Sequence, residues 1–331
     1  MKNFFVMVNV LLVLACSAVV AGRQIEMGGR DYAIAVRDGV KARFTFRIVD
    51  EVGNVVTGAI VQVSFAWHDS QWIKGTSDEN GNFTAEGTSS GKILYDVNKD
   101  GYYKTASEYQ FRGEGKIRIE DRKWLPWNPT NTVILKRVNC PATMYARACD
   151  ATRDLIIPLK GTNVAFDLEK GDWVEPYGKG RCCDLVVNCD DQFTDPWTGF
   201  RKLALTFGAN ALDGVQRHKL DDFSDLRSLY EAPAFGYEKA ITWSFERTPE
   251  KMNVNEPSRD EYFVFRVRTF VDDNGKIVKA NYGKIYGPVH YGDLGGHLVL
   301  RMMYYFNPEV NSRNLEFDPK KNLSGQHISW P

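Results

Sequence analysis

The densest group of chemically capable residues lies in the segment Phe166–Gly180, which reads FDLEKGDWVEPYGKG. Within it, the carboxylates of Glu169, Asp172 and Glu175 lie close in sequence to the aromatic rings of Trp173 and Tyr177. Paired carboxylates carry out acid–base hydrolysis in glycosidases. In turns rich in glycine, however, acidic residues more often accept hydrogen bonds from the backbone. We favour the turn interpretation and assign no catalytic residue, although a glycan-active enzyme remains the alternative.

Aromatic side chains in or beside expected loops form a second candidate site. The rings that could bind a ligand are Trp72, Trp124, Trp127, Trp173 and Tyr177. Flat aromatic faces stack on sugar rings, so the expected partner is a cell-surface polysaccharide or another surface protein. The competing interpretation is that these rings cover the ends of a hydrophobic core.

Two short motifs suggest metal binding without satisfying its spacing. Asp96–Gly101 matches the opening of an EF-hand calcium loop, but Ser107 stands where the chelating glutamate belongs. His290 and His297 flank a glycine-rich stretch that contains Asp293, whereas scattered surface histidines are far commoner than ligands. We therefore predict no metal and no cofactor.

The cysteines after residue 21 are disulfide candidates in an oxidising compartment. They are Cys140, Cys149, Cys182, Cys183 and Cys189. Cys140 and Cys149 are the expected local pair, because loop-like sequence separates them. The adjacent Cys182 and Cys183 are expected on opposite faces of a strand, so at most one of them meets Cys189 or the core.

The N-terminal residues, 1–21, have the pattern of an export signal. Lys2 precedes the apolar run Phe4–Ala15, and Val19 and Ala21 occupy suitable positions before a cleavage site. An alternative reading takes Val13–Cys16 as a lipobox, with Cys16 lipidated; ordinary cleavage is favoured. The apolar run is too short to span a bilayer, for which about 20 residues are needed. We expect an exported protein, either periplasmic, cell-surface or extracellular, with no transmembrane span in the mature chain.

Charge and composition narrow the class of protein further. Basic and acidic residues balance at 42 each, which argues against a nucleic-acid partner. Aromatic residues make up 13% of the chain, a composition suited to β-sheet cores.

Alternating apolar and polar residues predict strands through the first half. Lys41–Val49 and Gly58–Trp67 are the clearest cases. Further strands are expected at Asp31–Arg37, Lys92–Val97, Gly115–Glu120 and Asn131–Val138.

Residues 40–138 resemble the carboxypeptidase-regulatory-like domain. The resemblance rests on Val49-Asp50, Gly58-Ala59, Thr76 with Asp78, Gly81 with Phe83, and Gly101-Tyr102. That family implies a seven-stranded, transthyretin-like β-sandwich. It also implies an accessory role, as a spacer, adhesion or cell-surface module, and brings no catalytic residues.

The second half is also expected to be rich in strands. They are predicted at Leu155–Leu159, Asn163–Leu168, Asp184–Cys189, Lys202–Phe207, Ala240–Arg247, Glu261–Val271, Lys276–Tyr286 and Leu298–Phe306. Asn274-Gly275 predicts a hairpin with a type I′ turn. Asp221–Glu231 is the one expected helix, and Asn307–Pro331 is expected to be a polar, extended tail.

Residues 140–323 resemble a group of uncharacterised exported bacterial proteins. The shared features are the Phe166–Gly180 stretch, the strand Tyr262–Thr269 and the tail Asn314–Leu323. This likeness implies no activity.

Together these patterns predict an all-β chain. Residues 1–21 form the signal, 22–138 a seven-stranded sandwich, and 139–331 a larger antiparallel β-domain with one short helix. The expected function is that of an exported, non-enzymatic binding or structural protein of the bacterial cell surface or periplasm. A carbohydrate-binding module or a glycan-active enzyme is the alternative.

Overall fold

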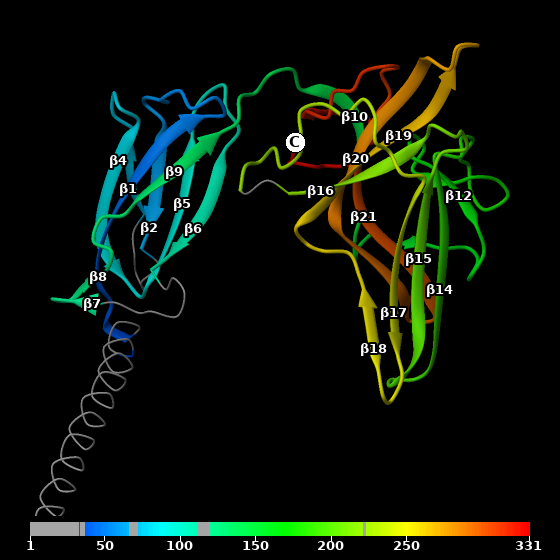
Figure 1. The fold of residues 1–331 in the computed structure, drawn as a ribbon, viewed down its shortest axis with the longest axis horizontal. Helices are drawn as coiled ribbons and strands as arrows, with labels where there is room; N and C mark the ends of the chain where they lie inside the picture. The colour runs from blue at the N-terminus through cyan, green and yellow to red at the C-terminus, as the bar shows by residue number, and fades with distance from the viewer. Residues whose placement is uncertain (1–32, 34–36, 66–71, 112–118, 221–222) are drawn as a thin grey trace, which may run out of the picture. The chain divides into compact units, whose positions relative to one another are not determined.

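A computed structural model of the protein describes residues 33, 37–65, 72–111, 119–220 and 223–331. These residues form 22 strands, and the predicted all-β class is confirmed. No helix among them is long and apolar enough to cross a membrane. The chain divides into two compact units, Met1–Val138 and Asn139–Pro331, each described here by itself (Figure 1).

The first unit is built from two sheets. One has the order β4-β1-β8-β7, with β9 parallel to β1, and the other has the order β3-β2-β5-β6. The strands of the first sheet are β1 (Val40–Asp50), β4 (Asn82–Ser89), β7 (Ile119–Glu120), β8 (Lys123–Trp124) and β9 (Thr130–Leu135). Those of the second are β2 (Ile60–Ser64), β3 (Ile73–Thr76), β5 (Lys92–Asn98) and β6 (Thr105–Gln110).

The core of this unit follows from the period-two pattern of β1. Ala42, Phe44, Phe46 and Ile48 are fully buried, and Val61 of β2 belongs to the same cluster. Burying each large apolar side chain contributes about 1.5–3 kcal/mol. The strand predicted at Lys41–Val49 is therefore confirmed.

Of the strands predicted in this unit, one is shorter than predicted and two lie mostly outside the described residues. The strand predicted at Gly58–Trp67 ends at Ser64, and its last residues are not described. Arg37 is helical, while most of Asp31–Arg37 and Gly115–Glu120 also lies outside the described residues.

The second unit contains two larger sheets. One has the order β16-β19-β20-β21-β10-β22, with β11 beside β21, and the other has the order β13-β12-β14-β15-β17-β18. The first comprises β10 (Ala142–Cys149), β11 (Leu155–Ile156), β16 (Gly214–Lys219), β19 (Glu261–Val271), β20 (Ile277–Leu294), β21 (His297–Asn307) and β22 (Phe317–Asn322). The other comprises β12 (Val164–Asp167), β13 (Asp172–Trp173), β14 (Leu185–Asp195), β15 (Thr198–Phe207), β17 (Ala240–Arg247) and β18 (Met252–Asn255).

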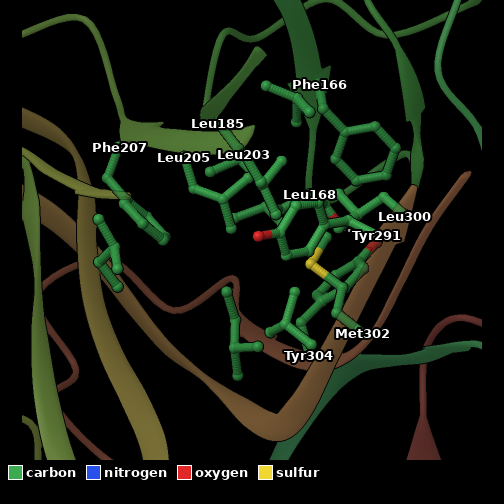
Figure 2. Packing of buried hydrophobic residues seen from close by; sticks show 14 of the residues in the cluster. Phe166, Leu168, Leu185, Leu203, Leu205, Phe207, Tyr291, Leu300, Met302 and Tyr304 are labelled. Carbon is green, nitrogen blue, oxygen red and sulfur yellow. Dashed lines mark hydrogen bonds between the residues drawn. The ribbon is translucent and has the colours of Figure 1, made fainter. Parts of the chain in front are cut away.

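Both faces of the first of these sheets are buried. Phe263 and Phe265 join the core shared with β14 and β15, whose packing is shown in Figure 2. On the opposite face, Tyr262 and Val264 belong to a second cluster, which is completed by residues such as Leu315. The sequence of β19 is consequently an almost continuous apolar run, as expected for a strand covered on both sides.

The hairpin predicted at Asn274-Gly275 joins β19 to β20, but its turn is not type I′. A type I′ turn needs positive φ at both central residues, and of this pair only Gly275 has it, at 78°. Asp272 sets the geometry instead: its carboxylate accepts the N–H groups of Asn274 and Lys276, and its carbonyl accepts that of Gly275.

The predicted helix Asp221–Glu231 is wrong for residues 223–231, which are not helical. Their backbone finds partners in the C-terminal segment instead, because Tyr230 accepts the N–H of Leu315 and Ala232 donates to Arg313. The tail predicted to be polar and extended is packed against the sheet, since it contains β22 and the buried residues Leu315, Phe317 and Ile328.

Candidate functional site

The segment Phe166–Gly180 folds as a tight loop built on two short strands. β12 and β13 pair antiparallel, with Phe166 opposite Trp173 and Asp167 opposite Asp172. Gly171, with φ of 67°, forms part of the turn between them. The N–H of Gly180 returns to the carbonyl of Trp173, which closes the loop. Its backbone is therefore fixed at both ends.

Asp167 organises this loop from within. Its Oδ1 accepts the N–H groups of Glu169 and Lys170, each at 3.0 Å. Its Oδ2 accepts those of Arg181 and Cys182, at 2.9 and 3.0 Å. Burial opposes ionisation of this carboxyl, but the backbone hydrogen bonds and Arg268 prevail and hold its pKa below the ordinary value.

Arg268 joins the loop to β19 through three carboxylates. Its Nε and Nη2 donate to the two oxygens of Asp184, each at 2.8 Å, and Nη1 donates to Glu169 at 2.8 Å. Nη2 also lies 3.4 Å from Asp167 Oδ1. Arg268 has φ of 57°, at an irregularity in the pairing of β19 with β20. Burial raises the pKa of Asp184, and its hydrogen bonds with Arg268 oppose that shift.

Asp172 and Glu169 were candidates for catalysis from the sequence, and both have structural roles in the loop. Asp172 accepts the N–H of Trp173 at 2.8 Å and that of Lys179 at 2.9 Å, while Glu169 is bound to Arg268. Glu175 is exposed on the far part of the loop. The turn interpretation fits this geometry.

Two of the five predicted ligand-binding aromatics are core residues. Trp124 is fully buried and donates to the carbonyl of Ser89 at 2.9 Å. Trp173 is buried and donates to the carbonyl of Ile156 at 2.8 Å. Trp124 packs against Phe111 and Trp173 against Phe166. Because both rings are buried, the proposal that they stack on a ligand is wrong.

The other three predicted aromatics have exposed surface. Trp72 is 51% exposed and Tyr177 is 44% exposed. Trp127 is partly exposed, and the ammonium of Lys123 lies 5.2 Å from its ring centroid. Trp72 precedes β3, whereas Trp127 follows β8 in the other sheet of the first unit.

All five cysteines of the described chain are free thiols. The predicted pair of Cys140 and Cys149 is wrong, because the intervening residues form β10 instead of a loop. At about 3.3 Å per residue, that strand holds the two cysteines more than about 20 Å apart. A disulfide needs Cα atoms within about 7 Å. Cys16 lies outside the described residues.

The remaining cysteines lie in β14 or just before it. Cys182 and Cys183 precede β14, so the prediction that they lie within a strand is wrong. Cys189 is fully buried in β14, and burial raises its thiol pKa to about 12. Burial likewise raises the pKa of Cys149 to about 11. The raised pKa makes both thiols poorly reactive, since the thiolate is the nucleophile.

The segments considered for metal binding belong to regular strands and turns. Asp96 lies in β5 and pairs with Lys104 at 3.4 Å. His290 is opposite Arg301 and His297 is opposite Leu294, so the hairpin keeps the two histidines apart. The stretch predicted as a loop at Tyr291–Gly296 is largely strand, since β20 extends to Leu294. Within the described ranges no His, Cys, Asp or Glu cluster is arranged to hold a metal ion.

A groove at the edge of the second unit was not predicted from the sequence. A cavity of about 750 Å³ opens there between β16 and β17. Its walls include Gln216 and Arg217 on β16, Ala240 and Thr242 on β17, and the connecting residue Phe235. The chain connects these two strands through residues 223–239, and the helix predicted over part of this connection does not form.

A buried lysine is the second feature that the sequence did not reveal. Lys284 is fully buried on β20, and its Nζ donates to Ser228 Oγ at 3.0 Å and to the hydroxyl of Tyr286 at 3.1 Å. The ammonium also lies 4.8 and 4.9 Å from the ring centroids of Tyr286 and Tyr305. These two tyrosines donate to the carbonyls of Pro331 and Trp330. The cluster therefore anchors the C-terminal segment to the sheet.

No protein-family model matches the sequence, and no curated protein matches it either. Among solved structures, chlorocatechol 1,2-dioxygenase from Pseudomonas putida is similar over 30% of this chain and 61% of its own, at 15% identity and a TM-score of 0.26. The chain thus spans less than two thirds of that enzyme.

Two pilins are similar over longer stretches. A streptococcal ancillary pilin matches 80% of this chain and 59% of its own, at 10% identity and a TM-score of 0.22. The shaft pilin SpaA from Lactobacillus rhamnosus GG matches 52% of this chain and 89% of its own, at 11% identity and a TM-score of 0.21. TM-scores this low assign neither a fold nor a function to the chain.

Proposed function

We propose that this is an exported, non-enzymatic protein that binds or builds something at the bacterial cell surface or in the periplasm. The observation that carries the proposal is the structural use of the carboxylates in Phe166–Gly180. Asp172 accepts two backbone N–H groups, and Glu169 is bound to Arg268. A general acid or base must be free to exchange a proton with a substrate, and these groups are instead engaged in holding the loop.

Export and an accessory role are the parts of the proposal that come from the sequence. The export signal supports the compartment, and the pattern within residues 40–138 supports an accessory module of the carboxypeptidase-regulatory-like type. The two packed sheets of the first unit are compatible with such a module.

The test compares catalysis with stability in two variants of the loop. We expect the secreted protein to release no sugar from a panel of bacterial and plant glycans. Asp172→Asn and Glu169→Gln should both lower the melting temperature, because each weakens the closure of the loop. Hydrolysis by the wild type that disappears in either variant, with the melting temperature unchanged, would overturn the proposal in favour of a glycan-active enzyme.

Carbohydrate binding is the second candidate function, favoured by the exposed ring of Trp72. Sugar stacking would use this ring, and Trp72→Ala should then weaken binding by about 0.5–1.5 kcal/mol, the value of one aromatic contact. The matched control is Trp330→Ala, since Trp330 is similarly exposed but was not predicted to bind sugar. Equal affinities of the wild type and both variants for every bound glycan would exclude Trp72 as a sugar platform.

A further inference from the structure

One part of β17 has a strand neighbour on only one side. β17 pairs with β15 along its whole length, from Ala240 to Arg247. On its other side, β18 pairs only with Ser244–Arg247. Within the described chain, Ala240–Trp243 therefore form an open sheet edge, and this edge is one wall of the groove.

The register shows which backbone groups face the groove. The N–H of Phe207 donates to the carbonyl of Lys239, so Ala240 and its partner Thr206 are a non-hydrogen-bonded pair. Ala240 and Thr242 consequently direct their backbone N–H and C=O groups away from β15. The carbonyl of Thr242 accepts the side-chain amide of Asn255, at the end of β18, at 3.2 Å.

The opposite wall is the edge of β16. Val215 exchanges two backbone hydrogen bonds with Glu238, at 2.8 and 2.9 Å, so its backbone N–H and C=O groups point away from β19. The alternation of a strand then directs the backbone groups of Arg217 the same way. Beside this wall stands Phe235, whose side chain is 83% exposed. Its carbonyl is held by a hydrogen bond from Gln216 Nε2.

The open stretch also lacks the usual protection of an edge strand. Natural proteins block exposed edges with charged side chains, proline or bulges. Ala240–Trp243 reads AITW, with no charge and no proline, and its pairing with β15 is regular. The cavity volume of about 750 Å³ lies within the range of about 300–1,000 Å³ that is typical of ligand sites.

We propose that this groove binds an extended polypeptide segment of a partner protein, which adds a strand to the open edge of β17. The main chain of that segment pairs with Ala240 and Thr242. Its side chain opposite Ile241 points between the sheets, where Val215 is also buried, and is therefore apolar. Phe235 closes over the bound strand and loses its exposed surface. This inference concerns the second unit alone and does not depend on export.

Backbone recognition makes the proposal testable with modified peptides. A library of random hexapeptides is selected against the full chain, and the affinity of each selected peptide is measured by fluorescence polarisation. N-methylation of every second residue removes the backbone N–H groups on one edge of the peptide strand. N-methylation of the other residues removes those on the opposite edge. We expect methylation in one register to weaken binding about tenfold or more, as loss of a ladder hydrogen bond requires, and in the other register to have little effect.

Two protein variants locate the bound peptide. Thr242→Pro removes an outward N–H group that the β15 ladder does not use, and Phe235→Ala removes the exposed ring. Both should weaken binding, whereas the control Phe223→Ala changes an exposed ring that does not line the groove and should not. Selected peptides that bind Phe235→Ala as tightly as the wild type, or that tolerate N-methylation in both registers, would overturn the proposal. So would a library that yields no binder. If Thr242→Pro fails to fold, N-methylation and Phe235→Ala still decide.

Discussion

The guanidinium of Arg268 and the carboxylate of Asp184 form a bidentate ion pair, with both hydrogen bonds at 2.8 Å. Asp184 is fully buried directly before β14, and Arg268 lies on β19 of the other sheet of the second unit. This pair therefore connects the two sheets of the second unit and fixes the base of the Phe166–Gly180 loop.

Removing Arg268 should be strongly destabilising. Arg268→Ala leaves the buried carboxylate of Asp184 without its cation, which typically costs about 3–5 kcal/mol. The free energy of unfolding from urea titration measures this loss. The control is Arg313→Ala, because Arg313 pairs with Glu231 on the surface, where such pairs contribute little. Equal stabilities of the two variants would contradict this role for Arg268.

Asp50 provides a prediction about pH. Arg137 donates to its carboxylate at 2.8 Å, and the backbone N–H groups of Val52 and Asn54 donate as well. Arg137, opposed by burial and assisted by these amides, lowers the pKa of Asp50 to about 2. Because the folded pKa lies below the unfolded value of about 3.9, the stability from this carboxylate is complete above about pH 4. It is lost as the pH falls towards 2.

An NMR titration of the Asp50 carboxyl carbon tests this prediction directly. Arg137→Ala should raise the pKa of Asp50 towards its unperturbed value, while Arg153→Ala, on another part of the chain, should leave it in place. A pKa near 4 in the wild-type protein would contradict the hydrogen-bonding pattern around Asp50.

The sequence predicted strands well where one face is buried and the other exposed. β1 and β17 show this alternation, and both are found where it placed them. Residues 223–231 misled the prediction, because local spacing cannot reveal that Tyr230 and Ala232 pair with the distant C-terminal segment. Tertiary pairing overrides a weak helical preference of this kind.

The candidate sites were harder to predict, because the residues that complete each of them are far apart in the sequence. The sequence correctly singled out Phe166–Gly180 as a compact loop, yet nothing local linked it to Arg268, about a hundred positions later. Lys284 stands in a strand pattern that gives no sign of its burial. The groove is defined by the end of β18, and strand ends are the least predictable feature of a sheet.

The thiols should differ in reactivity according to their burial. Without reductant, the unfolded protein should give five reactive thiols within residues 22–331. In the folded protein, a thiol reagent should modify the exposed Cys140 fastest, and Cys189, whose pKa burial raises to about 12, only on unfolding. Cys140→Ser identifies the fast phase. Fewer than five thiols in the unfolded, unreduced protein would show that disulfides form after all.

The buried Lys284 yields the last prediction. Lys284→Ala removes a cation from between two tyrosine rings and leaves the hydroxyls of Ser228 and Tyr286 without that donor. We expect a loss of about 2–5 kcal/mol in the free energy of unfolding, as for other long buried side chains truncated to alanine. Lys284→Met keeps the length and most of the packing, so it should cost less than Lys284→Ala.

Because Tyr286 and Tyr305 hold the carbonyls of Pro331 and Trp330, both variants should also speed proteolysis of the C-terminal segment, measured by mass spectrometry. The control Lys276→Ala, at the exposed β19–β20 turn, should change neither quantity. A C-terminal segment cut at the wild-type rate in Lys284→Ala would show that Lys284 does not anchor it.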